Sequence, residues 1–121
     1  MGRKILLVDD TETVLLFMRM MLSTYGYDMT TAHDGREALA AVQADPPDLI
    51  LLDIMMPVMD GIECCRRVKA DPKTNRIPIV MVTTKGEPAL VERAFLAGCN
   101  DYLTKPVSKL ELLAKVRGFI D

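Results

Sequence analysis

The stretch Asp48-Leu49-Ile50-Leu51-Leu52-Asp53 constrains the fold more than any other part of the sequence. Its four consecutive large apolar residues predict a strand covered on both faces, although the apolar pattern by itself also fits a piece of buried helix. Pro46-Pro47 precedes the run and Met56-Pro57 follows it, so a helix of ordinary length has no room. Asp53 is therefore expected at the C-terminal end of a buried central strand, where it either serves a ligand site or caps the next segment.

The size and charge of the chain narrow its class. Its 121 residues fit one domain over residues 1–121, and half of them are hydrophobic, as expected of a packed globule. The net charge of −2 leaves no electrostatic footprint for nucleic acid or an anionic membrane, and no apolar run approaches the roughly 20 residues of a membrane span. Cys64, Cys65 and Cys99 lack metal-binding spacing, which favours plain thiols in a reducing cytoplasm over a metal or redox site.

Apolar runs and helical spacings alternate along the sequence. Strands are predicted over residues 4–8, 27–32, 49–53, 77–82 and 101–104. Helices are predicted to begin after the N-cap residues Thr11, Asp34, Asp60 and Ser108 and at Pro88, and to end near Tyr25, Asp45, Asp71, Ala97 and Ile120. This repeated strand–helix order with short connections predicts an α/β domain with a parallel sheet and helices on both faces.

Polar residues follow the apolar runs at one edge of the predicted sheet. Asp9 and Asp10 come after the first strand, and Asp53 ends the third. Thr83 follows the fourth strand and Lys105 the fifth. Because the carboxyl ends of parallel strands share an edge, these side chains are expected to converge. Neighbouring carboxylates repel one another and need a cation, and Mg²⁺, which prefers oxygen ligands, is the natural choice.

An ammonium group fixed beside such a metal site favours an anion such as phosphoryl. The metal and Lys105 would neutralise its oxygens, and Thr83 would donate a hydrogen bond to it. Asp53 is the best candidate for a nucleophile that forms an aspartyl phosphate, with Asp9 and Asp10 as metal carriers. Each residue also has a structural alternative, because aspartates cap helices, a threonine can bond loop backbone, and a lysine can simply be solvated.

These residues resemble a known family over the whole chain. The segments Asp9-Asp10, Asp53-x-x-Met56-Pro57-x-Met59-Asp60-Gly61, Thr83 and Asp101-Tyr102-Leu103-x-Lys105-Pro106 look like the receiver domain of bacterial two-component response regulators. Several separated motifs in the right order make the resemblance specific. It implies a flavodoxin-like, doubly wound sheet with the strand order 2-1-3-4-5, as in chemotaxis regulators.

The resemblance also implies a phosphoryl donor and a metal site. Asp53 would be the phosphoacceptor, and the donor would be the phosphohistidine of a histidine kinase or of a phosphotransfer protein. Asp10 and Asp53 would bind Mg²⁺ directly, Asp9 would bind it mostly through water, and the backbone carbonyl of Met55 would complete the protein ligands.

The remaining site residues would bind phosphoryl and report its arrival. Lys105 would pair with the phosphoryl group, in a cis peptide with Pro106, and Thr83 would swing in to bond it. Tyr102 would be the switch aromatic that rotates inward when Thr83 moves. Thr84, beside the phosphate, stands where the family usually has a smaller residue and is expected to restrict access; Lys85 either contacts phosphoryl or a donor or is solvated.

The implied function is a signalling module rather than an enzyme with a separate substrate. Self-phosphorylation from a phosphodonor and self-dephosphorylation are expected. The surface formed by the fourth helix, fifth strand and fifth helix would then change and bind a downstream protein or output domain, or form a phosphorylation-dependent dimer. Direct contact with nucleic acid or membrane is not expected.

Two other functions compete with this prediction. A Mg²⁺-dependent phosphatase with an aspartate nucleophile usually needs a second acid/base aspartate two residues later, and Met55 occupies that place. A degenerate receiver would bind partners without phosphorylation. The intact site residues argue against it: Asp9, Asp10, Asp53, Thr83 and Lys105.

Overall fold

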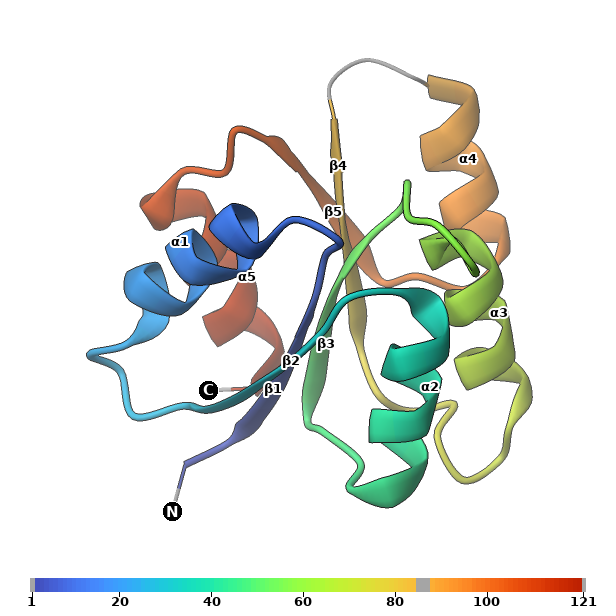
Figure 1. Cartoon of the computed structure of the whole chain (residues 1–121), viewed down its shortest axis with the longest axis horizontal. Coiled ribbons are helices and arrows are strands. Elements are labelled where there is room, and N and C mark those ends of the chain that lie inside the picture. Colours follow the sequence, from blue (N-terminus) through green and yellow to red (C-terminus); the bar gives the residue numbers. More distant parts are fainter. Residues whose placement is uncertain (1, 85–87, 121) are drawn as a thin grey trace.

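Five strands and five helices alternate in the computed structural model, which describes residues 2–84 and 88–120 (Figure 1). The strands are β1 (Lys4–Val8), β2 (Asp28–Ala32), β3 (Leu49–Asp53), β4 (Ile79–Thr84) and β5 (Asp101–Lys105). The helices are α1 (Glu12–Leu22), α2 (Gly35–Ala44), α3 (Gly61–Ala70), α4 (Pro88–Leu96) and α5 (Lys109–Ile120). No helix in these described ranges is long and apolar enough to cross a membrane.

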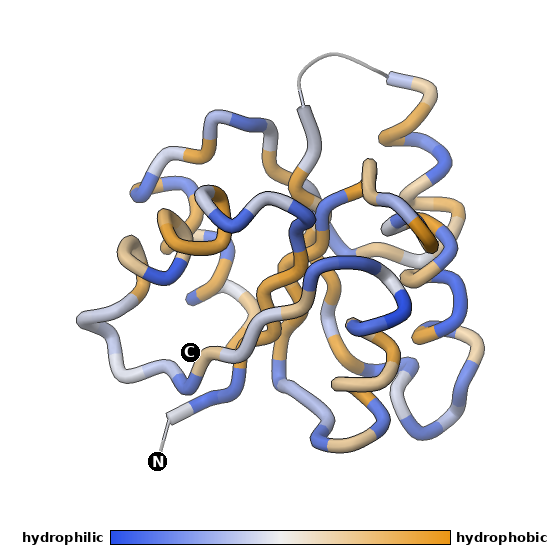
Figure 2. Tube along the Cα trace, in the orientation of Figure 1, coloured by the Kyte–Doolittle hydropathy of each residue, from blue (hydrophilic) through white to orange (hydrophobic). Residues whose placement is uncertain are grey.

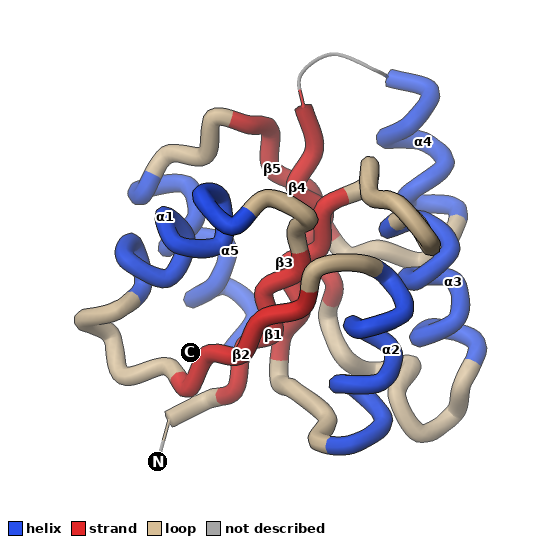
Figure 3. The backbone as a smooth tube through the Cα atoms, viewed as in Figure 1, coloured by secondary structure: helices blue, strands red, loops and turns tan. Residues whose placement is uncertain are grey.

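All strand pairs in the sheet are parallel, and the strand order is β2-β1-β3-β4-β5. The predicted doubly wound, flavodoxin-like α/β fold is thereby confirmed. The sheet forms a single central layer, with α1 and α5 against one face and α2, α3 and α4 against the other (Figures 1 and 3). Val8 pairs with Leu52 and Asp53 pairs with Val82, so the carboxyl ends of β1, β3 and β4 lie side by side.

The central strands are buried because apolar side chains pack on both sheet faces. Every residue of β3 is buried, as predicted from its unbroken apolar run. One core cluster, around Leu6, Ile50 and Met81, packs beneath α2, α3 and α4, and the other, around Leu7 and Leu51, packs beneath α1 and α5. The hydrophobic residues accordingly concentrate along the middle of the sheet (Figure 2). The three cysteines are buried thiols, and no disulfide joins them.

Most of the predicted helix caps are present. The side chains of Asp34, Asp60 and Ser108 each accept the backbone N–H three residues later, at 2.8, 2.9 and 3.1 Å. The predicted cap by Thr11 is wrong, because the Thr11 side chain makes no capping hydrogen bond. The backbone N–H of Thr11 instead donates to Asp9 Oδ1 at 2.9 Å, so a carboxylate at the sheet edge binds the backbone just before α1.

Two predicted boundaries differ from the structure. β4 runs over residues 79–84 rather than 77–82, because Pro78 cannot donate a ladder hydrogen bond and Thr83 and Thr84 pair with β5. The first helix ends at Leu22 rather than near Tyr25, and Gly26, with φ of 79°, lies in the turn that follows. Tyr25 packs instead against cationic side chains of α5.

Gly61 brings the start of α3 against the end of β3. Its N–H donates to the Ile54 carbonyl at 2.8 Å, and a Cβ at this position would lie 2.1 Å from the Asp53 carbonyl oxygen. Glycine is therefore required by the close approach of two backbones, one of which holds Asp53.

Replacement of Gly61 by alanine is expected to destabilise the fold. The added methyl group must push α3 away from β3, at a cost of about 1–3 kcal/mol in the free energy of unfolding. Gly118→Ala in α5 is the matched control, because a Cβ there meets nothing within 4 Å. We expect that control to stabilise by about 0.5–1 kcal/mol through helix propensity. Urea unfolding checks both, and equal effects would contradict the steric argument.

Candidate active site

Three carboxylates meet at the carboxyl edge of the sheet. Asp9 and Asp10 follow β1 and Asp53 ends β3, and one carboxylate oxygen from each lies within 4.8 Å of the others. Asp9 and Asp53 are buried, whereas Asp10 is exposed. The convergence predicted for these three side chains is thus present.

Lys105 supplies the cation of the cluster. Its Nζ lies 2.8 Å from Asp9 Oδ2 and 3.5 Å from Asp53 Oδ1, at the end of β5. Burial works against the charged form of Lys105, but its interactions with Asp9 and Asp53 outweigh this effect and raise the pKa of the ammonium above 10.5. The alternative of a solvated lysine is therefore wrong, and Lys105 bridges two of the carboxylates.

Asp9 is held by backbone hydrogen bonds on one side and faces Lys105 on the other. Its N–H donates to the Ala32 carbonyl at 3.1 Å, and its Oδ1 accepts from Thr11. Its Oδ2 is buried, and its one charged partner in the described part of the chain is the Lys105 ammonium at 2.8 Å. A buried carboxylate oxygen in this condition, beside two further carboxylates, fits a hard divalent cation with oxygen ligands.

The electrostatics of the cluster act most strongly on Asp53. Burial, followed by the negative charge of Asp9, raises the pKa of the Asp53 carboxyl to about 6, and Lys105 offsets only part of the rise. Burial and the neighbouring carboxylates together therefore outweigh the single ammonium group, and further positive charge at the site would favour the ionised form of Asp53.

The sequence matches the family model described as "Response regulator receiver domain" over residues 5–117. The chain belongs to this family. Among its curated relatives, the response regulator PleD of Caulobacter vibrioides is 42% identical over 97% of this chain, and the regulator PhoP of Bacillus subtilis is 40% identical over 99%. The chain spans 26% of the length of PleD and 49% of the length of PhoP, so these relatives contain much more than a receiver domain.

Solved receiver domains have the same architecture. The chemotaxis protein CheY4 of Vibrio cholerae superposes with a TM-score of 0.92 at 33% identity, covering 99% of this chain and 100% of that one. The receiver domain of a sensor histidine kinase from Pseudomonas aeruginosa, which has a magnesium ion coordinated in its active site cleft, gives a TM-score of 0.91 at 33% identity. That alignment covers 99% of this chain and 98% of the other.

Two of the predicted phosphoryl-binding residues of this receiver domain, Thr83 and Thr84, end β4, the strand next to the one that Asp53 ends. Thr83 is buried near the end of β4, and its hydroxyl donates to the Thr84 carbonyl at 3.1 Å. Thr84 is exposed and pairs with Lys105 across the β4–β5 ladder. The Lys105–Pro106 peptide is cis, as expected. Lys85 lies outside the described residues.

Two further predicted residues lie around this cluster. The Met55 side chain is exposed in the connection after β3. Tyr102 is 39% exposed on β5 and packs edge-on against Phe95 of α4, with 6.0 Å between ring centroids. The Tyr102 ring is therefore partly open to solvent and in contact with α4.

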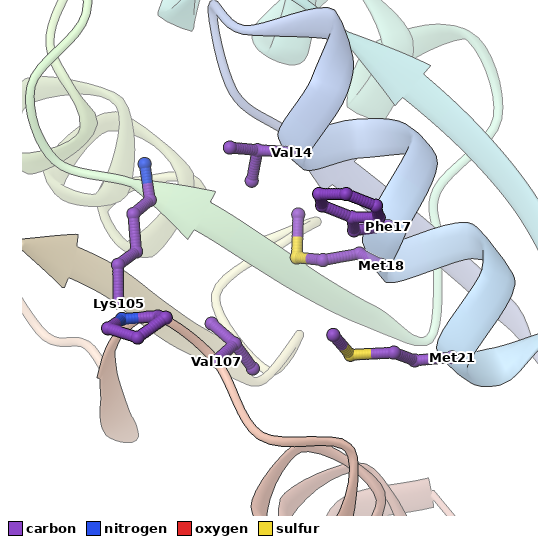
Figure 4. A pocket seen from close by; sticks show the side chains of 7 residues that line it. Val14, Phe17, Met18, Met21, Lys105 and Val107 are labelled. Carbon is purple, nitrogen blue, oxygen red and sulfur yellow. The ribbon is translucent and has the colours of Figure 1, made fainter.

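An apolar pocket of about 400 Å³ adjoins Lys105 (Figure 4). It lies between α1 and the connection from β5 to α5, and its lining residues are Val14, Phe17, Met18, Met21, Lys105, Pro106 and Val107. Nearby on α1, Leu16, Phe17 and Met20 are each more than half exposed. The sequence signal for this surface was present, because α1 is apolar nearly all the way round, where a surface helix usually has a polar face.

A cluster of His33, Glu12 and Glu37 was also missed by the sequence analysis. The Nδ1 of His33 lies 3.0 Å from Glu37 Oε1, and its Nε2 contacts Glu12 Oε1. The spacing of four between His33 and Glu37 was a local signal. Glu12 is distant in sequence, and only the β2–β1 pairing brings it near.

The raised pKa of Asp53 predicts a characteristic pH dependence of stability without metal. Between pH 3.8, the ordinary carboxyl value, and about 6, the folded protein binds a proton at Asp53 that the unfolded chain has released. The contribution of Asp53 to the free energy of unfolding therefore falls as pH rises through this window, by about 1–3 kcal/mol.

The measurement is urea unfolding of the wild type and Asp53→Asn in EDTA at pH 4 and pH 7. The wild type should lose stability relative to Asp53→Asn as the pH rises, because asparagine stays neutral. A relative gain would show that the Asp53 carboxylate is stabilised in the folded protein, contrary to the geometry.

Proposed function

We propose that this receiver domain accepts a phosphoryl group on Asp53 from the phosphohistidine of a histidine kinase or phosphotransfer protein. The observation that supports this role best is the position of Lys105, whose Nζ contacts both Asp9 and Asp53 at the edge of the sheet. Asp53 is a buried carboxylate with other carboxylates and an ammonium group beside it. This setting suits a reaction that brings in both a divalent cation and a phosphoryl anion.

Asp9, Asp10, Asp53 and the Met55 carbonyl would hold Mg²⁺. When bound, the ion would neutralise the charge on phosphoryl oxygens. In the transfer itself, an Asp53 carboxylate oxygen forms the new O–P bond while the P–N bond to the donor histidine breaks. Lys105 then exchanges its contact with the Asp53 oxygen for one with the phosphoryl oxygens.

The phosphoryl group then changes the hydrogen bonding of Thr83. The Thr83 hydroxyl leaves the Thr84 carbonyl and donates to a phosphoryl oxygen, a partner that exists only in the phosphorylated state. The space opened by this movement admits Tyr102, which leaves Phe95 and alters the surface of α4, β5 and α5. A downstream protein or output domain, or a second copy of the chain, reads that surface. Thr84, at the rim, slows access to the phosphoryl group.

The protein then acts as a switch with no separate substrate rather than as a phosphatase. Self-phosphorylation from small donors and self-dephosphorylation follow from the same residues. A phosphatase would need an acid or base two positions after Asp53, and Met55 offers no titratable group there.

The chemistry is tested by mass measurement of the intact protein. After incubation with acetyl phosphate and Mg²⁺, we expect a phosphoryl mass gain in the wild type and none in Asp53→Asn. EDTA should abolish the gain. A gain retained by Asp53→Asn would place the phosphoryl group elsewhere, and turnover of many unrelated phosphate esters would favour the phosphatase.

We further propose that the donor protein docks on the exposed apolar side chains of α1. A donor must bring its histidine to Asp53, and Lys105, which contacts Asp53, also lines the apolar pocket beside α1. Phe17 both lines this pocket and is 53% exposed, which suits an aromatic side chain that a partner covers.

Phe17→Ser is expected to slow phosphorylation by a protein donor but not by a small-molecule donor. Loss of a buried aromatic contact should slow phosphoryl transfer from a histidine kinase about tenfold, and leave the rate with acetyl phosphate within about twofold. Phe119→Ser is the matched control, because Phe119 is partly exposed near the far end of α5. Equal slowing with both donors would mean that Phe17 supports the site itself, and an unchanged kinase rate would place donor docking elsewhere.

A further inference from the structure

His33 lies at the same sheet edge as the acidic cluster. It directly follows Ala32, the last residue of β2, whose carbonyl accepts the backbone N–H of Asp9 at 3.1 Å. His33 is the only histidine in the sequence. The connection from β2 to α2 is therefore anchored to the segment that carries two of the three site carboxylates.

The ring of His33 is placed between two carboxylates. Its Nδ1 lies 3.0 Å from Glu37 Oε1, which also accepts the backbone N–H of His33 at 3.0 Å, and its Nε2 contacts Glu12 Oε1. A neutral imidazole carries one N–H, so only the imidazolium donates to both carboxylates. The hydrogen bonds to Glu37 and then to Glu12 raise the pKa of His33 above 6.5.

Glu12 is a further negative charge, on the segment that carries Asp9 and Asp10. It opens α1 two residues after Asp10, and its side chain is exposed. Without the imidazolium, the Glu12 carboxylate would add its field to that of Asp9, Asp10 and Asp53, where burial and then the charge of Asp9 already raise the pKa of Asp53. The site must nevertheless admit the negative charge of a phosphodonor.

We propose that His33 sets the charge balance of the acidic site, by holding Glu12 in an ion pair so that a dianionic phosphodonor can enter beside a divalent cation. This inference rests on the proposed function. Loss of the positive charge has opposite consequences for the two ligands, because a more negative rim attracts a cation and repels an anion.

A purely structural role for His33 would have a different signature. If the His33 ring only held the β2–α2 connection against the start of α1, its removal would displace Asp10. Metal binding and phosphorylation would then weaken together. The direction of change for each ligand therefore distinguishes charge balance from simple bracing.

His33→Gln provides the test, since it removes the charge from an exposed position. At low ionic strength we expect Mg²⁺ to bind about two- to fourfold more tightly, as measured by calorimetric titration with MgCl₂ alone. At saturating Mg²⁺, the concentration of acetyl phosphate that gives half-maximal phosphorylation should rise by about the same factor. Both shifts should shrink in about 0.5 M salt, because exposed charges are screened.

Charge-matched variants complete the experiment. His33→Lys retains a cation and should keep both constants near the wild-type values, and Glu12→Gln added to His33→Gln should restore them. Weaker Mg²⁺ binding combined with poorer phosphorylation would overturn the proposal in favour of bracing, and unchanged constants would overturn it outright. A wild-type protein that neither binds Mg²⁺ nor takes up phosphoryl would instead refute the proposed function.

Discussion

The repulsion among three carboxylates at the end of a buried sheet is the constraint on which the rest of this structure depends. Asp9 and Asp53 are buried, and a charge is costly in a buried position. Asp10 lies beside them. Lys105 contacts two of the three and compensates for part of the cost, while the pKa of Asp53 stays raised. The protein is stable enough to fold with these charges in place, and binding of a cation at the site would stabilise it further.

The fold tolerates this cost because the carboxylates extend from strands whose other residues are apolar. The strands β1, β3 and β4 are covered by helices on both faces, so the side chains at their carboxyl ends have little freedom to move apart. The close backbone approach at Gly61 adds a second constraint on the position of Asp53. The geometry of the site is thus set by packing that lies mostly outside it.

Sequence patterns were sufficient where a single interaction dominates. The unbroken apolar runs of β1 and β3 predicted buried strands, and the residues directly after them predicted the acidic edge. Thr83 could not be assigned to β4 by pattern, because the apolar run ends at Val82 and the ladder to β5 carries the strand further. The missing Thr11 cap has a similar cause, since Asp9, already at the sheet edge, accepts the backbone N–H of Thr11.

Long-range polar contacts were beyond sequence reasoning. The contact of His33 with Glu12 spans 21 positions and depends on the pairing of β2 with β1. The outward position of Tyr102 depends on its packing against Phe95, which a strand pattern does not reveal. In both cases the residue types were visible, but the partner that gives them meaning came only with the tertiary structure.

The two ends of the connection between β3 and α3 are held together by a backbone hydrogen bond. The hydrogen bond from Gly61 to Ile54 joins its two ends, a second bond joins Met59 to Gly35, and the side chains of Met55 and Val58 stand out in solvent between them. Both of these hydrogen bonds join backbone atoms and use no side chain of the connection. At these two points backbone atoms hold the connection, so the identity of its exposed side chains lies outside the hydrogen bonding that fixes it.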